Sequence, residues 1–161
     1  MAMPKSFLRR AILLALMALP SFVSAEEQEI RRCDFKLKRG CIAGYATVTL
    51  ARGTLARLEA LVIWCGPGGH RKNLDYSCTI DSSRDDKASA WSQEAGATVI
   101  ANGSPWNPDE PDRVKVTVGR DVSIDFDEAQ SLGRCGAGAE LPRAIVIPAH
   151  KAACRVWLRT P

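Results

Sequence analysis

Six cysteines constrain this chain more than any other feature of its 161 residues. They are Cys33, Cys41, Cys65, Cys78, Cys135 and Cys154, an even number. No two of them have the CxxC spacing, which argues against a thioredoxin-like redox site, a zinc ribbon and a c-type haem. Cysteines of exported proteins pair in an oxidising compartment, so we expect a fold that disulfides stabilise.

The sequence does not determine which cysteines pair. Short loops cost the least entropy to close, which favours pairing in sequence order. We therefore expect Cys33 to pair with Cys41, Cys65 with Cys78, and Cys135 with Cys154. Each bond would contribute about 2–4 kcal/mol to stability.

The first residues have the pattern of an export signal. Three basic residues come first, an apolar run covers Ala11–Leu19, and small residues follow at Val23–Ala25. This pattern predicts a cleavable signal peptide over residues 1–25. The apolar run is far shorter than the roughly 20 residues of a membrane-spanning helix, so we expect no stable membrane insertion after cleavage. Residues 26–161 are expected to form a single disulfide-bonded β domain that is periplasmic or secreted.

The charge balance gives no reason to expect nucleic acid as a partner. The whole chain has 22 basic and 18 acidic residues, and removal of the signal peptide leaves 19 and 18, a net charge of +1. The charge is uneven along the chain. Arg31–Lys72 has nine basic and two acidic residues, and Asp75–Glu128 has five basic and twelve acidic residues. The two halves are expected to compensate each other in the fold; the alternative is a bipolar surface that steers a charged partner.

Alternating apolar and polar residues predict strands along most of the mature chain. The clearest pattern is a β-hairpin in which Val114–Val118 and Val122–Phe126 flank a turn at Gly119. Asp81–Ser92 is polar and predicts a long loop or one helical turn, and Asn102–Asp112 contains three prolines and predicts an irregular loop. The other expected strands are Tyr45–Leu50, Leu58–Cys65, Leu74–Ile80, Thr98–Ala101, Ala144–Ile147 and Ala153–Leu158.

About seven or eight short strands separated by Gly and Pro turns indicate a mainly β fold. We expect an antiparallel sandwich or a small barrel, stabilised by disulfides.

Two loops carry the candidate binding residues. His70, Arg71 and Lys72 follow a glycine-rich stretch whose backbone N–H groups could bind an anion, although the P-loop spacing is absent. The alternative is an ordinary connection with solvated charges. The proline-rich loop contains Trp106, which either covers the core or contacts a ligand. It lies beside Asp109, Glu110 and Asp112.

Catalysis is poorly supported by the sequence. The chain has no GxSxG or SxxK motif, and paired cysteines would be unable to act as nucleophiles. Asp121, Asp125 and Asp127 would share the outward face of one strand, where they could bind calcium or act as a glycosidase-like acid pair. A charged strand face that discourages edge pairing is the favoured interpretation, and we expect no metal and no cofactor. A small hydrolase that uses His70 or His150 with a carboxylate remains an alternative.

These observations favour an exported binding module whose partner is another protein or an envelope glycan. One concrete role is that of an inhibitor of, or an immunity factor against, a hydrolase that attacks the envelope. The alternative is a carbohydrate-binding or envelope-assembly protein in which Trp91 or Trp106 stacks on sugar rings.

Overall fold

The computed structural model describes residues 27–37, 42–64, 76–102, 112–131, 134–136, 139–150 and 152–159. These residues contain ten β-strands and no α-helix. The strands form two antiparallel sheets, and the expected mainly β, antiparallel fold with disulfides is confirmed.

The four-stranded sheet is an antiparallel meander in the order β1-β2-β3-β4. Its strands are β1 (Gln28–Leu37), β2 (Ile42–Ala51), β3 (Thr54–Ile63) and β4 (Ser77–Ser83). The six-stranded sheet has the order β10-β9-β8-β7-β6-β5. Its strands are β5 (Ser89–Glu94), β6 (Ala97–Asn102), β7 (Arg113–Val118), β8 (Val122–Asp125), β9 (Ala144–Ile147) and β10 (Arg155–Trp157).

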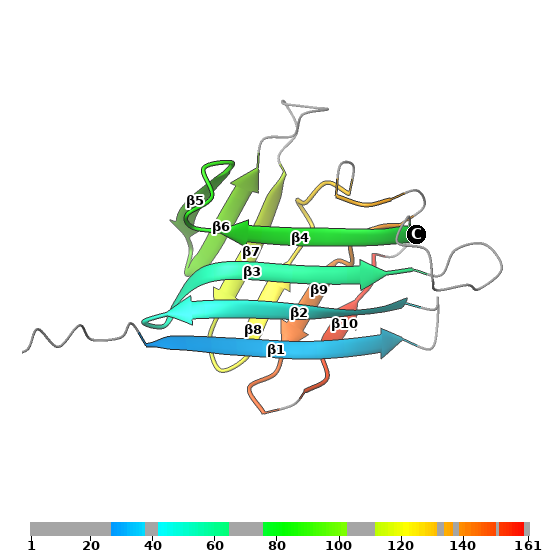
Figure 1. Cartoon of the computed structure of the whole chain (residues 1–161), viewed down its shortest axis with the longest axis horizontal. Coiled ribbons are helices and arrows are strands. Elements are labelled where there is room, and N and C mark those ends of the chain that lie inside the picture. Colours follow the sequence, from blue (N-terminus) through cyan, green and yellow to red (C-terminus); the bar gives the residue numbers. More distant parts are fainter. Residues whose placement is uncertain are drawn as a thin grey trace, which may run out of the picture.

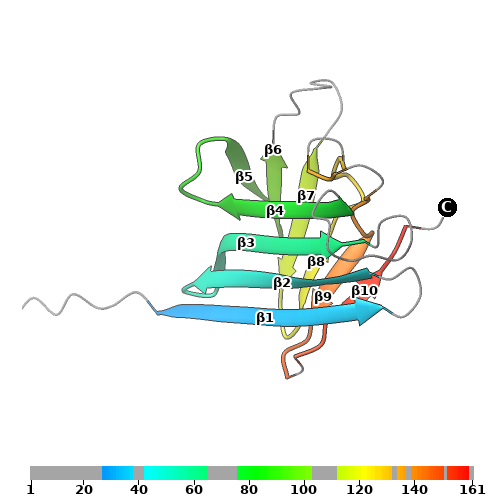
Figure 2. The same ribbon diagram turned by 45° about the vertical axis from the view of Figure 1, so that its right-hand side comes forward.

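The two sheets face each other with their strands steeply crossed (Figures 1 and 2). Side chains alternate between the two faces of a strand, so every second residue points into the space between the sheets. The inward residues are buried and apolar, for example Val48 and Leu58 in one sheet and Val116 and Ile124 in the other. Phe126, just after β8, is the largest of the fully buried side chains. Burial of these side chains is the main favourable contribution to folding.

Gly44 on β2 is required by the close approach of its neighbours. A Cβ atom at this position would lie 1.9 Å from the Leu61 carbonyl oxygen and 2.7 Å from the ring of Phe35. Phe35 pairs with Gly44 across the β1–β2 ladder, so its ring occupies the space that the glycine leaves open.

Two strands differ from the expectation. A loop or a helical turn was expected over Asp81–Ser92. Instead, β4 continues to Ser83, and β5 begins at Ser89 and extends to Glu94. β5 is an edge strand whose side chains are mostly exposed, so it lacks the apolar alternation that would have predicted it. β1 was not predicted either, because only Cys33 and Phe35 of its ten residues are buried. Pairing with β2 over its whole length accounts for its strand conformation.

The sequential cysteine pairing is wrong. Cys33 pairs with Cys154, and Cys78 pairs with Cys135, with Cα–Cα distances of 5.1 and 4.0 Å. The cost of closing a loop rises only slowly with its length, so the proximity of strands in the fold decides the pairing. Cys41 and Cys65 lie outside the described residues.

Each of these disulfides connects one edge of the four-stranded sheet to a segment from the C-terminal part of the chain. At β1, Asp34 donates its N–H to Ala152 O (2.8 Å) and accepts from Cys154 N (2.9 Å). At β4, Thr79 N donates to Arg134 O (3.0 Å), beside the bridge between Cys78 and Cys135. Both edges are therefore partly closed by backbone hydrogen bonds and by one covalent link each.

Candidate functional site

The residues of the two candidate loops are not placed by the structure. His70, Arg71, Lys72, Trp106, Asp109 and Glu110 all lie outside the described residues. Their proposed binding roles stay predictions.

The carboxylates on the outward side of β8 are already bound by neighbours. Asp121 accepts from Arg155 (2.6 Å) and from the backbone N–H of Ala149 (3.1 Å). Asp127 binds Arg143 at 3.2 Å, and Asp125 caps the N–H of Asp127. In the described part of the chain, no three His, Cys, Asp or Glu side chains are grouped so that they could hold a metal ion. This row therefore acts as a set of internal ion pairs and turn caps.

His150 does not have the arrangement that a general base needs. It is exposed on the connection between β9 and β10, and it forms no ion pair with any described carboxylate. A catalytic histidine would need such a group, or the substrate, within hydrogen-bond reach. The geometry around His150 thus offers no support for a hydrolase.

Trp91, one of the two tryptophans considered for stacking on sugars, is half-buried. It lies on β5 opposite Ile100 and packs, partly buried, against the core. The guanidinium carbon of Arg84 lies 5.4 Å from the centre of its ring, as in a cation–π contact.

The most distinctive surface surrounds the turn between β9 and β10. This connection extends beyond β1 at the lower side of the molecule (Figure 1). A hollow of about 490 Å³ separates it from β1, and we call this the β1 hollow. A second hollow of about 310 Å³ lies between this turn and the β7–β8 turn, and we call it the Arg120 hollow. It is lined by Arg120, Asp121, Pro148, Ala149, His150, Ala153 and Arg155.

Three segments around these hollows are fixed to one another. Asp121 connects the β7–β8 turn to Ala149 and to Arg155 of β10. Arg31 of β1 donates through Nη1 to the carbonyl oxygen of Gly119 (2.8 Å), and Cys33 is bonded to Cys154. The backbone that frames the hollows is therefore held from several sides.

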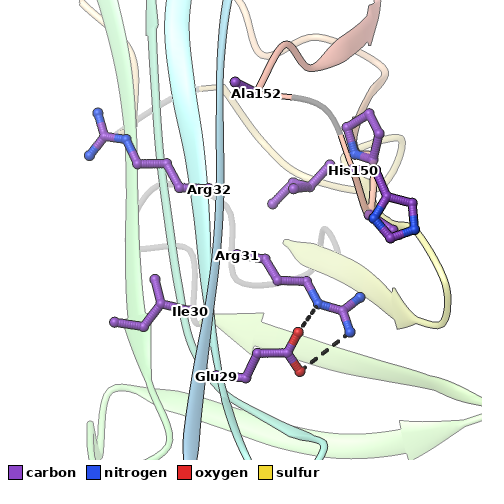
Figure 3. A pocket seen from close by; sticks show the side chains of 9 residues that line it. Glu29, Ile30, Arg31, Arg32, His150 and Ala152 are labelled. Carbon is purple, nitrogen blue, oxygen red and sulfur yellow. Dashed lines mark hydrogen bonds and ion pairs between the residues drawn. The ribbon is translucent and has the colours of Figure 1, made fainter.

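The β1 hollow contains an ion pair of its own. Arg31 Nε donates to Glu29 Oε1 at 2.6 Å (Figure 3). This hydrogen bond lowers the pKa of Glu29 below its ordinary value of 4.5, and desolvation partly opposes it. The contact with Arg31 thus favours the ionised form of Glu29.

The Arg120 hollow has an excess of positive charge. Among the described residues that line it, Asp121 is the only carboxylate, and it is bound by Arg155. The guanidinium of Arg120 makes no hydrogen bond or ion pair to the described residues, and His150 lies in the same lining. The hollow can therefore provide an Arg fork, and a histidine beside it, to an incoming anionic group.

Sequence reasoning did not find Arg120 and Arg155 as site residues. Arg120 belongs to a turn and Arg155 to a short strand, and neither position has a local signal of binding. They come together with His150 only because the β7–β8 and β9–β10 turns meet at the same end of the six-stranded sheet.

A third hollow, of about 430 Å³, lies beside the β2–β3 and β5–β6 turns. Its polar groups satisfy one another, since Gln93 Nε2 donates to Thr98 Oγ1 and Arg84 Nε donates to Leu55 O, both at 2.7 Å. Fewer polar side chains in this third hollow are therefore free to bind a ligand than in the Arg120 hollow, as far as the described residues show.

Comparison of the chain with family models, curated proteins and solved structures finds no match. Within the described residues, no helix is long and apolar enough to cross a membrane.

Proposed function

We propose that this protein is an exported binding module whose Arg120 hollow binds a carboxylate-bearing segment of another protein. The observation that carries the proposal is the guanidinium of Arg120, which has no partner among the described residues and lines the same hollow as His150, within a backbone that hydrogen bonds hold in place. Export is supported by the N-terminal pattern of the sequence and by two disulfides, which persist in oxidising compartments.

The rigid frame favours binding because little order has to be gained on association. Immobilising flexible groups costs free energy, and a surface that is already fixed avoids much of this cost. Here the turns that present Arg120 and His150 are held by Asp121, by Arg31 and by the Cys33–Cys154 bond.

The size of the hollow favours a protein side chain over a larger ligand. Its volume of about 310 Å³ lies at the lower end of the roughly 300–1,000 Å³ typical of small-molecule sites. One or two acidic side chains would fill it, and an Arg guanidinium can bind a carboxylate through two parallel hydrogen bonds.

An envelope-attacking hydrolase is the partner class that we propose within this function. Acidic side chains that such a hydrolase presents on its surface would enter the Arg120 hollow, whose positive charge complements them. The protein would then act as an inhibitor or an immunity factor.

The test uses the mature protein and two charge-reversal variants. Arg120→Glu reverses the charge in the hollow, and Lys87→Glu makes the same change at an exposed position between β4 and β5. Each protein is immobilised and used to capture partners from envelope and secreted fractions, and its effect on peptidoglycan hydrolysis is measured. We expect a stoichiometric protein partner whose affinity falls at least tenfold with Arg120→Glu and is unchanged with Lys87→Glu.

Two results would contradict the proposal. One is a protein partner that Arg120→Glu retains with full affinity. The other is retention on purified peptidoglycan alone, which would favour the carbohydrate-binding alternative.

A further inference from the structure

The N-terminal half of β1 has an unpaired edge. β1 forms the outer edge of the four-stranded sheet, and β2 pairs with its other side (Figures 1 and 2). On the outer side, the described backbone hydrogen bonds of β1 are those of Asp34 with Ala152 and Cys154. On this side, no described strand lies beside residues 28–32, and the β1 hollow adjoins them.

The direction of the free backbone groups follows from Asp34. Its N–H and C=O both point away from β2, and residues two positions apart in a strand point their backbone groups to the same side. Arg32, Ile30 and Gln28 therefore present their N–H and C=O groups at the open edge. An exposed edge of this kind is a template for another strand.

The side chains along this edge are self-complementary. Ile30 is 67% exposed, and it is the midpoint of the five free residues. If two copies of residues 28–32 pair antiparallel about Ile30, Ile30 lies opposite its own copy. Glu29 then lies opposite Arg31 of the second chain, and Arg31 opposite Glu29. Each Glu29, which binds Arg31 of its own chain, would then also face Arg31 of the second chain, so two equivalent charge pairs arise by symmetry, as an isologous interface requires.

The backbone agrees with this register. Because Ile30 points its N–H and C=O outward, the two Ile30 residues would exchange both hydrogen bonds, as directly opposed residues do in one of the two kinds of antiparallel pair. Gln28 and Arg32 would do the same at either end. The register uses all five free residues and ends before Asp34, whose backbone groups are already bound.

We propose that the β1 edge binds a second copy of this chain, forming a symmetric dimer through antiparallel pairing centred on Ile30. The two four-stranded sheets become one continuous sheet, and the exposed apolar side chain of Ile30 packs against its copy. Figure 3 shows Ile30 and Arg32 on one side of the strand, and Glu29 and Arg31 on the other side with the β9–β10 turn. None of the described residues that line the Arg120 hollow belongs to β1, although the two hollows share Pro148, Ala149 and His150, so the dimer is tested with variants of its own in β1.

Charge reversal tests the register. Glu29→Arg alone and Arg31→Glu alone each place like charges opposite each other, and we expect at least a tenfold weaker self-association in sedimentation velocity. The double variant Glu29→Arg with Arg31→Glu restores both pairs and is expected to dimerise like the parent. An equimolar mixture of the two single variants is expected to form a heterodimer, because its opposed charges are complementary.

Two further variants at Ile30 test the backbone pairing and the proximity of the two strands. Ile30→Pro removes an N–H that points to the open edge and leaves the β1–β2 ladder intact, so it should abolish dimers while thermal unfolding stays cooperative. Ile30→Cys should cross-link two chains, since directly opposed residues lie within disulfide reach. Asp81→Cys, on the exposed face of β4, is the control that should not.

The proposal would be overturned if the parent protein stayed monomeric at millimolar concentration. It would also be overturned if the Ile30→Pro variant still dimerised, or if the mixture of the two single charge-reversal variants associated no better than either variant alone. Loss of partner capture by Arg120→Glu with dimerisation unchanged would separate this inference from the proposed function.

Discussion

At the scale of single residues, Asp112 at the end of the proline-rich loop forms hydrogen bonds within the protein. It is buried, and its carboxylate accepts a hydrogen bond from Arg134 at 2.6 Å and from the backbone N–H of Gln130 at 3.0 Å. Arg134 is itself largely buried and precedes Cys135. This ion pair therefore fixes the segment that closes the β4 edge.

We predict that Asp112→Ala lowers the free energy of unfolding by about 3 kcal/mol, because it leaves the buried charge of Arg134 without a partner. Asp125→Ala removes an exposed turn cap and should cost less than about 1 kcal/mol. Urea unfolding with the disulfides intact measures both. Equal losses in the two variants would show that the Asp112–Arg134 pair has no special role.

At the scale of elements, two hairpin turns place a residue other than glycine in the left-handed region. Arg52–Gly53 joins β2 to β3 with φ values of 51° and 75°, and Ala95–Gly96 joins β5 to β6 with 48° and 82°. Positive φ at both central positions matches the type I′ turn, whose twist suits a two-residue hairpin. Alanine pays a steric cost in this conformation that asparagine largely avoids.

We predict that Ala95→Asn raises the free energy of unfolding by roughly 1 kcal/mol. The side chain is exposed, so the change alters no packing. Ala90→Asn, at an exposed position within β5, is the matched control and should be neutral or slightly destabilising, because asparagine is a poor strand former. Thermal unfolding of the three proteins compares them, and a loss of stability in Ala95→Asn would contradict the turn assignment.

The elements that the sequence could predict are those whose pattern is set by burial on one face. The β7–β8 hairpin follows directly from its alternating valines and isoleucine, of which Val114, Val116, Val122 and Ile124 are buried. β1 and β5 are edge strands with few buried side chains, so their conformation depends on a neighbour that the local sequence does not reveal. The Arg120 hollow was not predicted either, because its residues come from two separate turns and from β10.

At the scale of the whole molecule, the described disulfides leave two cysteines to be assigned. Cys33 is bound to Cys154 and Cys78 to Cys135. By elimination, we predict that Cys41 and Cys65 form the third bond of the mature protein.

Peptide mapping under non-reducing conditions tests this assignment. A peptide that contains both Cys41 and Cys65 in a bridge is the expected result, and alkylation of either residue without reduction would contradict it. The bonds of Cys33 and Cys78 serve as internal references in the same map.

The bond between Cys33 and Cys154 spans 121 residues of sequence. It joins the first strand to the residue just before β10, so this bond can form only after residue 154 has been synthesised. Local pairing such as the β7–β8 hairpin needs no such delay. A chain truncated before residue 154 would lack this bond, and its β1 edge would have no covalent link to the C-terminal segment.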